Sequence, residues 1–81
     1  MTEPFFDNAT GISWANRLID AFGSDATAAA LAARSALSAA GFEYPADPSL
    51  AVACEAYAAL NGVDTLLDVV AAGVPLEDVL S

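Results

Sequence analysis

The chain has 81 residues, of which 57% are hydrophobic and 20 are alanine, and its eleven acidic residues stand against two arginines, with no lysine or histidine. The net charge of −9 repels nucleic acid, whose binding depends on Lys and Arg, and it also repels anionic membrane surfaces. Because Cys54 is the only cysteine, and histidine and lysine are missing, the sequence excludes hydrolytic triads and zinc sites built from His and Cys.

The apolar residues are numerous enough to form a core, but many of them are small. Leu, Ile, Val and Phe supply 21 residues, so the chain is expected to fold as one domain, residues 1–81. Since alanine is so frequent, the core is expected to come from helix backbones that approach closely. Such a core predicts marginal stability, or self-association that covers an exposed face.

The first predicted helix spans residues 8–22. Asp7 is expected to cap this helix, Asn8 to hold its entry and Gly23 to end it. Apolar residues at helical spacing predict an inner face made of Ile12, Ala15, Leu18, Ile19 and Phe22.

The only tryptophan, Trp14, lies at the edge of that apolar stripe. Together with Phe5 or Phe6, it is expected to hold the N-terminal segment against the bundle. We therefore expect Trp14 to have a structural role.

The second predicted helix begins at the cap Ser24 and runs to Ala40. Asp25 follows the cap, where an acidic side chain favours the positive end of the helix dipole. Leu31 and Leu37 are the only large apolar residues of this helix, so most of its surface is alanine and serine. Such a surface can lie very close to a neighbouring helix, which predicts a position inside the bundle or at a subunit contact.

The third predicted helix follows the linker GFEYPADP. Asp47 and Pro48 predict its start, because aspartate caps helices and proline suits the first helical position. The helix is expected to run to about Asn61, before Gly62. Its apolar positions include Leu50, Ala53, Cys54, Tyr57, Ala58 and Leu60.

A fourth predicted helix covers residues 65–72, with Asp64 as its cap, Asp68 turned outward and Gly73 at its end. One more short turn in the tail is expected to pack back through Leu76, Val79 and Leu80. The whole pattern predicts an all-α protein, a compact bundle of about four helices with short connections punctuated by Gly and Pro.

The acidic residues fall into two groups. One group occupies predicted helix starts, where a carboxylate meets unpaired backbone N–H groups, and consists of Asp7, Asp25, Asp47 and Asp64. The other acids either provide solubility or form a surface for a basic protein partner. The candidate partner-binding residues are Glu43, Tyr44, Glu55, Asp68, Glu77 and Asp78. No metal or cofactor is expected, because the carboxylates lack the regular spacing of a calcium loop.

Two aromatic residues, Phe42 and Tyr44, bracket Glu43 in the central linker. An aromatic pair beside a carboxylate is typical of a binding edge. The alternative is structural, with Phe42 plugging the bundle and Tyr44 lying along its rim.

Two segments resemble a family of short bacterial proteins of unknown function. The residues that match its N-terminal motif, in which Phe-Asp-Asn precedes a tryptophan, are Phe6, Asp7, Asn8 and Trp14. Those that match its later Ala- and Glu-rich helix are Ala53, Glu55, Ala58, Ala59 and Gly62. The chain departs from the family at Ala9 and Ser13, where acids are expected, and no Trp-Gly pair precedes the motif. The resemblance covers residues 5–62 and implies a fold and a bacterial setting, but no activity.

These observations predict a non-enzymatic acidic protein that inhibits or regulates a basic protein, such as a toxin or a nuclease, in the manner of immunity or antitoxin proteins. The N-terminus lacks a basic segment and no apolar run reaches about 18 residues, which predicts a cytoplasmic protein without direct contact to membrane or nucleic acid. Two alternatives stay open. One is a phage-type nucleic-acid mimic that blocks a nuclease or a CRISPR effector. The other is a structural module that oligomerises, for instance as a homodimer, through the alanine face of the second helix.

Overall fold

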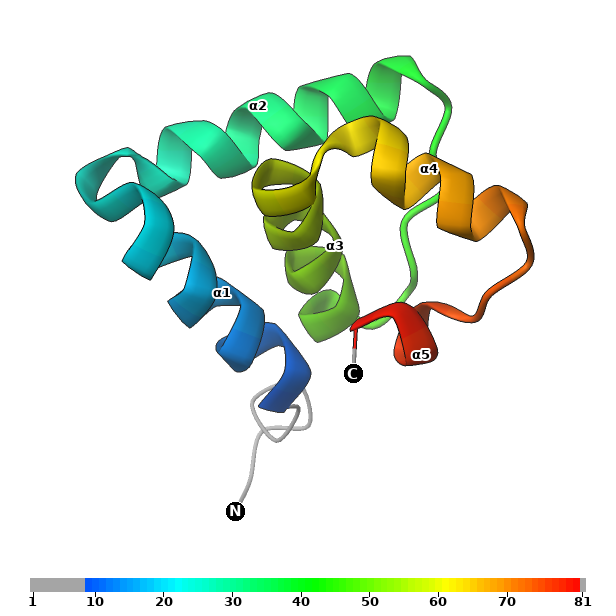
Figure 1. Cartoon of the computed structure of the whole chain (residues 1–81), viewed down its shortest axis with the longest axis horizontal. Coiled ribbons are helices and arrows are strands. Elements are labelled where there is room, and N and C mark those ends of the chain that lie inside the picture. Colours follow the sequence, from blue (N-terminus) through cyan, green and yellow to red (C-terminus); the bar gives the residue numbers. More distant parts are fainter. Residues whose placement is uncertain (1–8, 81) are drawn as a thin grey trace.

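The described part of the chain, residues 9–80 of a computed structural model, contains helices and no strand. Its α-helices are α1 (Ala9–Phe22), α2 (Ala26–Ala39), α3 (Pro48–Asn61), α4 (Val63–Ala71) and α5 (Leu76–Leu80). α1 and α2 form two arms of a V, and α3 lies between α1 and the pair of α4 and α5 (Figure 1). The predicted all-α bundle is confirmed. The expectations for Phe5, Phe6, Asp7 and Asn8 lie outside the described residues.

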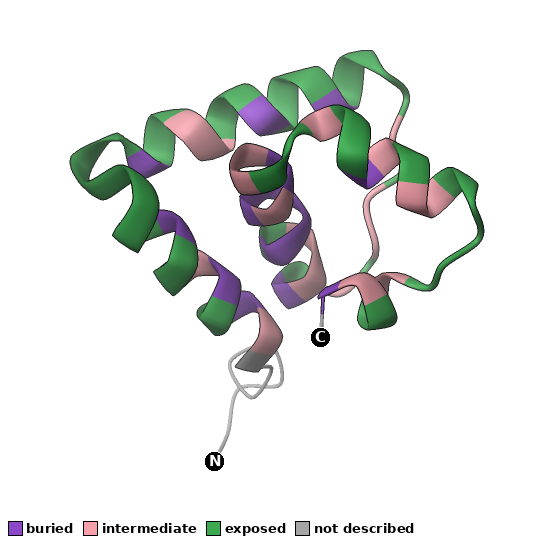
Figure 2. Cartoon of the chain, viewed as in Figure 1, coloured by how far each residue is buried: buried purple, intermediate pink, exposed green. Residues whose placement is uncertain are grey.

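The central helix is α3, which contacts each of the other four α-helices. It begins as predicted, because the Asp47 carboxylate accepts a hydrogen bond of 2.9 Å from the backbone N–H of Ser49 and Pro48 occupies the first turn. It also ends as predicted at Gly62, whose φ of 104° favours glycine. Most of its middle is buried (Figure 2).

α1 approaches α3 at a glycine. The backbone N–H of Gly11 lies in the first turn of α1, where helix donors lack an intrahelical partner, and it donates a hydrogen bond of 2.9 Å to Ser49 Oγ. A Cβ atom at position 11 would lie 2.8 Å from the backbone carbonyl oxygen of Ser49. Only glycine therefore permits this separation of the two helices.

The predicted inner face of α1 is wrong in part. The face that meets α3 carries Gly11, Trp14 and Leu18, all of them buried. Ile12 and Ile19 lie one residue, or about 100°, further around the helix and are 53% and 54% exposed. The remaining predicted members are Phe22, which is exposed, and Ala15, which is half-buried. The glycine contact sets this rotation, because it draws the adjacent face of α1 against α3.

α2 is not an internal helix. A 3-10 turn, Gly23–Asp25, precedes it, so Asp25 takes the cap position that was predicted for Ser24 and makes no side-chain capping bond. The residues of α2 that are buried are Ala26, Ala33 and Leu37. Leu31 is 51% exposed, and most of the helix faces outward (Figure 2). Its small side chains touch the bundle along one narrow edge, which leaves the predicted subunit contact as the open alternative.

α4 follows α3 directly at Gly62, which is the cap residue of α4. Asp64 therefore lies in the first turn of α4, where its charge still favours the helix dipole, and the predicted cap position was wrong. Asp68 is exposed, as expected. The predicted short turn in the tail is α5, whose Leu80 is buried while Leu76 and Val79 pack against the core.

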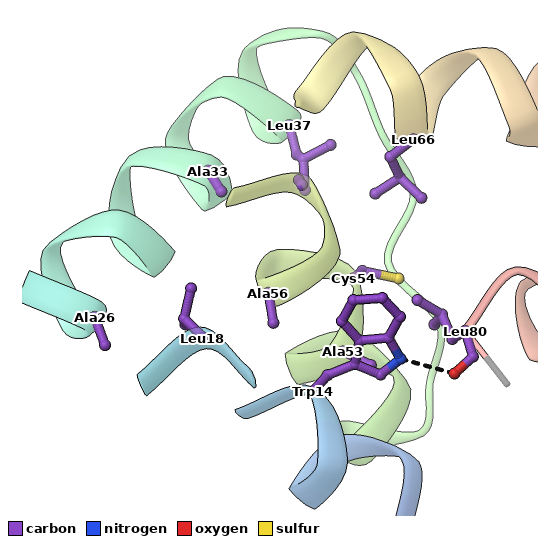
Figure 3. Close-up of a cluster of buried hydrophobic side chains, with 11 residues drawn as sticks. Trp14, Leu18, Ala26, Ala33, Leu37, Ala53, Cys54, Ala56, Leu66 and Leu80 are labelled. Atoms are coloured by element: carbon purple, nitrogen blue, oxygen red, sulfur yellow. Dashed lines mark hydrogen bonds between the residues drawn. The ribbon is translucent and has the colours of Figure 1, made fainter. Parts of the chain in front are cut away.

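The side chain of Trp14 joins three helices. Its indole Nε1–H donates a hydrogen bond of 2.7 Å to the backbone carbonyl of Leu80 (Figure 3). Its ring also meets Tyr57 edge to face, with 5.3 Å between the ring centroids. Trp14 is 6% exposed, so it is a core residue rather than an edge residue. Around it the core is small, since the largest fully buried side chains are Leu37, Leu66 and Cys54.

Within residues 9–80 no single helix has both the length and the apolar character to cross a membrane. α3 and α4 pass that test only as a pair, by length and composition, and they are bent by 120°.

Candidate functional site

The exposed acidic residues are concentrated in the C-terminal part of the chain. No lysine, arginine or histidine follows Arg34 in the sequence. The exposed acids beyond this point, which we term the C-terminal acidic set, are Glu43, Asp64, Asp68, Glu77 and Asp78. The α2–α3 linker and α5 lie at the opposite end of the molecule from the α1–α2 corner, whereas α4 begins between the two ends, where its Val63 lines the same depression as Phe22 (Figure 1). The protein is therefore electrically asymmetric.

Two pairs within this set place like charges close together. Asp64 and Asp68 are four residues apart on α4, so their side chains share one face of the helix. Glu77 and Asp78 are consecutive in the first turn of α5. Like charges four residues apart on a helix repel one another, and a cationic partner would remove that repulsion between Asp64 and Asp68.

Both arginines are engaged elsewhere. The guanidinium of Arg17 lies 4.4 Å from the centroid of the Trp14 ring, a cation–π contact. The Nε–H of Arg34 donates a hydrogen bond of 2.7 Å to Oε2 of Glu55, which is the ion pair found in the described part of the chain. Neither arginine lies in the segment that carries the C-terminal acidic set.

Glu55 does not belong to the exposed acids with which it was grouped. It is 7% exposed on the central helix α3, and Arg34 reaches it from the exposed flank of α2. A carboxylate in such a position needs a partner, because burying an unpaired charge is costly. As a predicted partner-binding residue, Glu55 is therefore better explained as a structural link between α2 and α3.

Tyr44 also points away from the surface. Its hydroxyl oxygen is buried near the Glu55 carboxylate. Burial, with the nearby Glu55 charge, raises the pKa of Tyr44 to about 12. Phe42 packs against the core and meets Tyr44 edge to face at 5.2 Å between centroids, which agrees with the structural alternative for this pair. Glu43 is the exposed member of the linker motif.

The remaining reactive group is Cys54, which is fully buried on α3. Burial, followed by the charge of the adjacent Glu55, raises the pKa of its thiol to about 11. The thiol therefore stays protonated near neutral pH, and a protonated thiol is a poor nucleophile. Among residues 9–80, no three Asp, Glu or Cys side chains are grouped to hold a metal ion.

Two shallow apolar depressions flank α2. The first, which we term the α1–α2 groove, has a volume of about 240 Å³, and its lining includes Ala15, Leu18, Ile19, Ala30, Leu31 and Arg34. The second has a volume of about 330 Å³, and its lining includes Phe22, Ala29, Ala33, Ala59 and Val63. The sequence signal for the groove was the apolar stripe of α1, which was assigned to the interior.

The chain matches no protein-family model, and no curated protein or solved structure is significantly similar to it. The resemblance that rests on Phe6, Asp7, Asn8 and Trp14 therefore stays a prediction. Any functional conclusion must come from the chemistry of the surface.

Proposed function

We propose that this protein is a non-enzymatic binding protein whose C-terminal acidic set binds and regulates a basic protein. One observation carries the proposal: Asp64 and Asp68 share an exposed face of α4, no lysine or arginine follows Arg34 in the sequence, and Arg17 and Arg34 are engaged by Trp14 and Glu55.

The arrangement of the acids favours a binding role over solubility alone. Interspersed charges of both signs keep a surface soluble without mutual repulsion. Here Asp64 and Asp68 share a helix face, and Glu77 and Asp78 are adjacent. A surface of one sign steers a partner of the opposite sign and accelerates association at low salt.

The class of partner follows from this charge. A basic toxin or nuclease suits an immunity-type or antitoxin-like inhibitor, and a cytoplasmic, bacterial setting is part of the same proposal. A nucleic-acid mimic would also bind a basic protein, but specifically in its nucleic-acid channel. Competition between DNA and this chain for the isolated partner distinguishes the inhibitor from the mimic. DNA must displace a mimic, because both would occupy the same channel of the partner.

The experiment begins with capture of the partner by the full chain from the cells that produce it, followed by measurement of Kd. We expect Asp64→Asn/Asp68→Asn to weaken binding by about tenfold, because each exposed pair contributes up to about 1 kcal/mol. Asp20→Asn/Asp25→Asn changes the net charge equally at the α1–α2 corner and should change Kd by less than about twofold.

Salt provides the second measurement. Binding through the C-terminal acidic set should weaken as ionic strength rises, because salt screens exposed charges. An affinity that is insensitive to salt would contradict the electrostatic proposal. Equal weakening by both pairs of substitutions would contradict the assignment to α4.

A further inference from the structure

The large apolar residues that remain exposed are concentrated on the first two helices. Ile12, Ile19, Phe22 and Leu31 belong to α1 or α2, and only two other large hydrophobic residues among those described, Val52 and Val74, are exposed. Ile12 and Ile19, with Ala15 between them, have the spacing of one helix face. This is the stripe that the sequence assigns to the interior, and the folded chain leaves it uncovered.

We propose that a second copy of this chain covers the stripe, forming a two-fold dimer through the α1–α2 groove. The groove is lined by Ala15 and Ile19 of α1 and by Ala30 and Leu31 of α2. In a two-fold arrangement the protruding Leu31 of each copy meets the small side chains of the other. Small residues allow helices to approach closely, and two-fold dimers are the commonest symmetric assembly.

Charge identifies the second copy as the occupant. None of the residues that line the groove is acidic, and the one charged residue, Arg34, is bound to Glu55. The exposed acids next to these residues in sequence are Asp20 and Asp25, so a basic partner gains less from the groove than from the five acids of the C-terminal acidic set. Two chains of net charge −9 repel one another through most of their surface, but here they can meet through residues that include none of the C-terminal acidic set.

The available area suits a weak dimer. Two helices of 14 residues, each about 21 Å long and about 10–12 Å wide, present on the order of 500 Å² per copy. The total of on the order of 1,000 Å² reaches the lower end of specific interfaces. The dimer is therefore expected to form and dissociate at concentrations between about 10 µM and about 1 mM.

Sedimentation of the full chain over this concentration range tests the proposal. We expect a monomer–dimer equilibrium that strengthens as salt rises from about 50 mM to about 500 mM, because salt screens the repulsion between two acidic copies. Ile19→Glu and Leu31→Glu should each raise the dimer Kd at least about tenfold. Both residues are about half-exposed, so helical content and the urea midpoint should be retained.

Val52→Glu is the matched control, since it adds the same charge at a 45% exposed valine of α3 that does not line the groove. It should change the dimer Kd by less than about threefold. A wild-type chain that stays monomeric at about 1 mM in high salt overturns the proposal. Equal weakening by Val52→Glu and Ile19→Glu overturns it as well, as does a dimer that salt weakens.

Discussion

The contact between Gly11 and Ser49 makes the substitution Gly11→Ala a sharp test of the packing of α1 against α3. Helix propensity alone favours alanine by about 1 kcal/mol. The added Cβ would nevertheless clash with Ser49 Oγ, and it would lie 2.8 Å from the carbonyl oxygen of Ser49 and 3.0 Å from its Cα. We expect the steric cost to exceed the gain in propensity.

The magnitude follows from these contacts. The Ser49 hydroxyl can rotate away only by giving up the hydrogen bond from the Gly11 N–H, at about 1 kcal/mol. The backbone atoms cannot rotate, so the helices must separate by about 0.6 Å to restore ordinary contact at 3.4 Å. Such overpacking costs about 1–3 kcal/mol. After the gain in propensity, Gly11→Ala should lower the free energy of unfolding by about 2 kcal/mol.

Urea and thermal denaturation, followed by far-UV circular dichroism, measure this effect. A loss of about 2 kcal/mol corresponds to a fall in Tm of about 8–16 °C for a chain of this size. Ser13→Ala, at an exposed position of the same helix, is the control for propensity and should change stability by less than about 0.5 kcal/mol. In the Ser49→Ala background the backbone contacts remain, so Gly11→Ala should still destabilise. A Gly11→Ala protein at least as stable as the wild type would refute the reasoning.

Two further predictions concern buried polar groups. Trp14→Phe should lower the free energy of unfolding by about 2 kcal/mol, because it removes the donor to the Leu80 carbonyl and part of the buried ring. Urea denaturation measures the effect, and unchanged stability would contradict the prediction. Stability should also fall as pH rises from about 9 to about 11. The pKa of the Cys54 thiol is near 9 in the unfolded chain but about 11 in the folded one, so only the unfolded state ionises in this interval. The contribution of the buried thiol, about 2–3 kcal/mol, is therefore complete below pH 9 and is lost progressively between pH 9 and pH 11. In Cys54→Ala the dependence of stability on pH should be shallower across this interval, and an unchanged dependence would count against burial of the thiol.

Local chemistry made some boundaries predictable. The start of α3 follows from Asp47 and Pro48 and its end from Gly62, because caps and left-handed glycines act within a few residues of the helix that they bound. The error at α4 has the same origin. Gly62 serves both helices, so Asp64 is left in the first turn rather than at the cap.

The errors of the candidate site come from long-range contacts. Glu55 was grouped with exposed acids, and its partner Arg34 is 21 residues away on another helix. The acceptor for Trp14 is 66 residues away, at Leu80. Local patterns in a single sequence do not reveal which distant helix meets which face. For Glu55, the run of small apolar residues around it on the third predicted helix was the available sign of burial.

The rotation of α1 links the small core to the proposed dimer. A chain with 20 alanines gains stability by bringing backbones together, and Gly11 allows this on the Trp14 face of α1. The consequence is that Ile12 and Ile19 remain in contact with water. The exposed acids cannot offset this loss, because like charges oppose the compact state. Burial of the α1–α2 groove against the proposed second copy would therefore supply apolar stabilisation that the monomer lacks, through a surface that does not include the C-terminal acidic set.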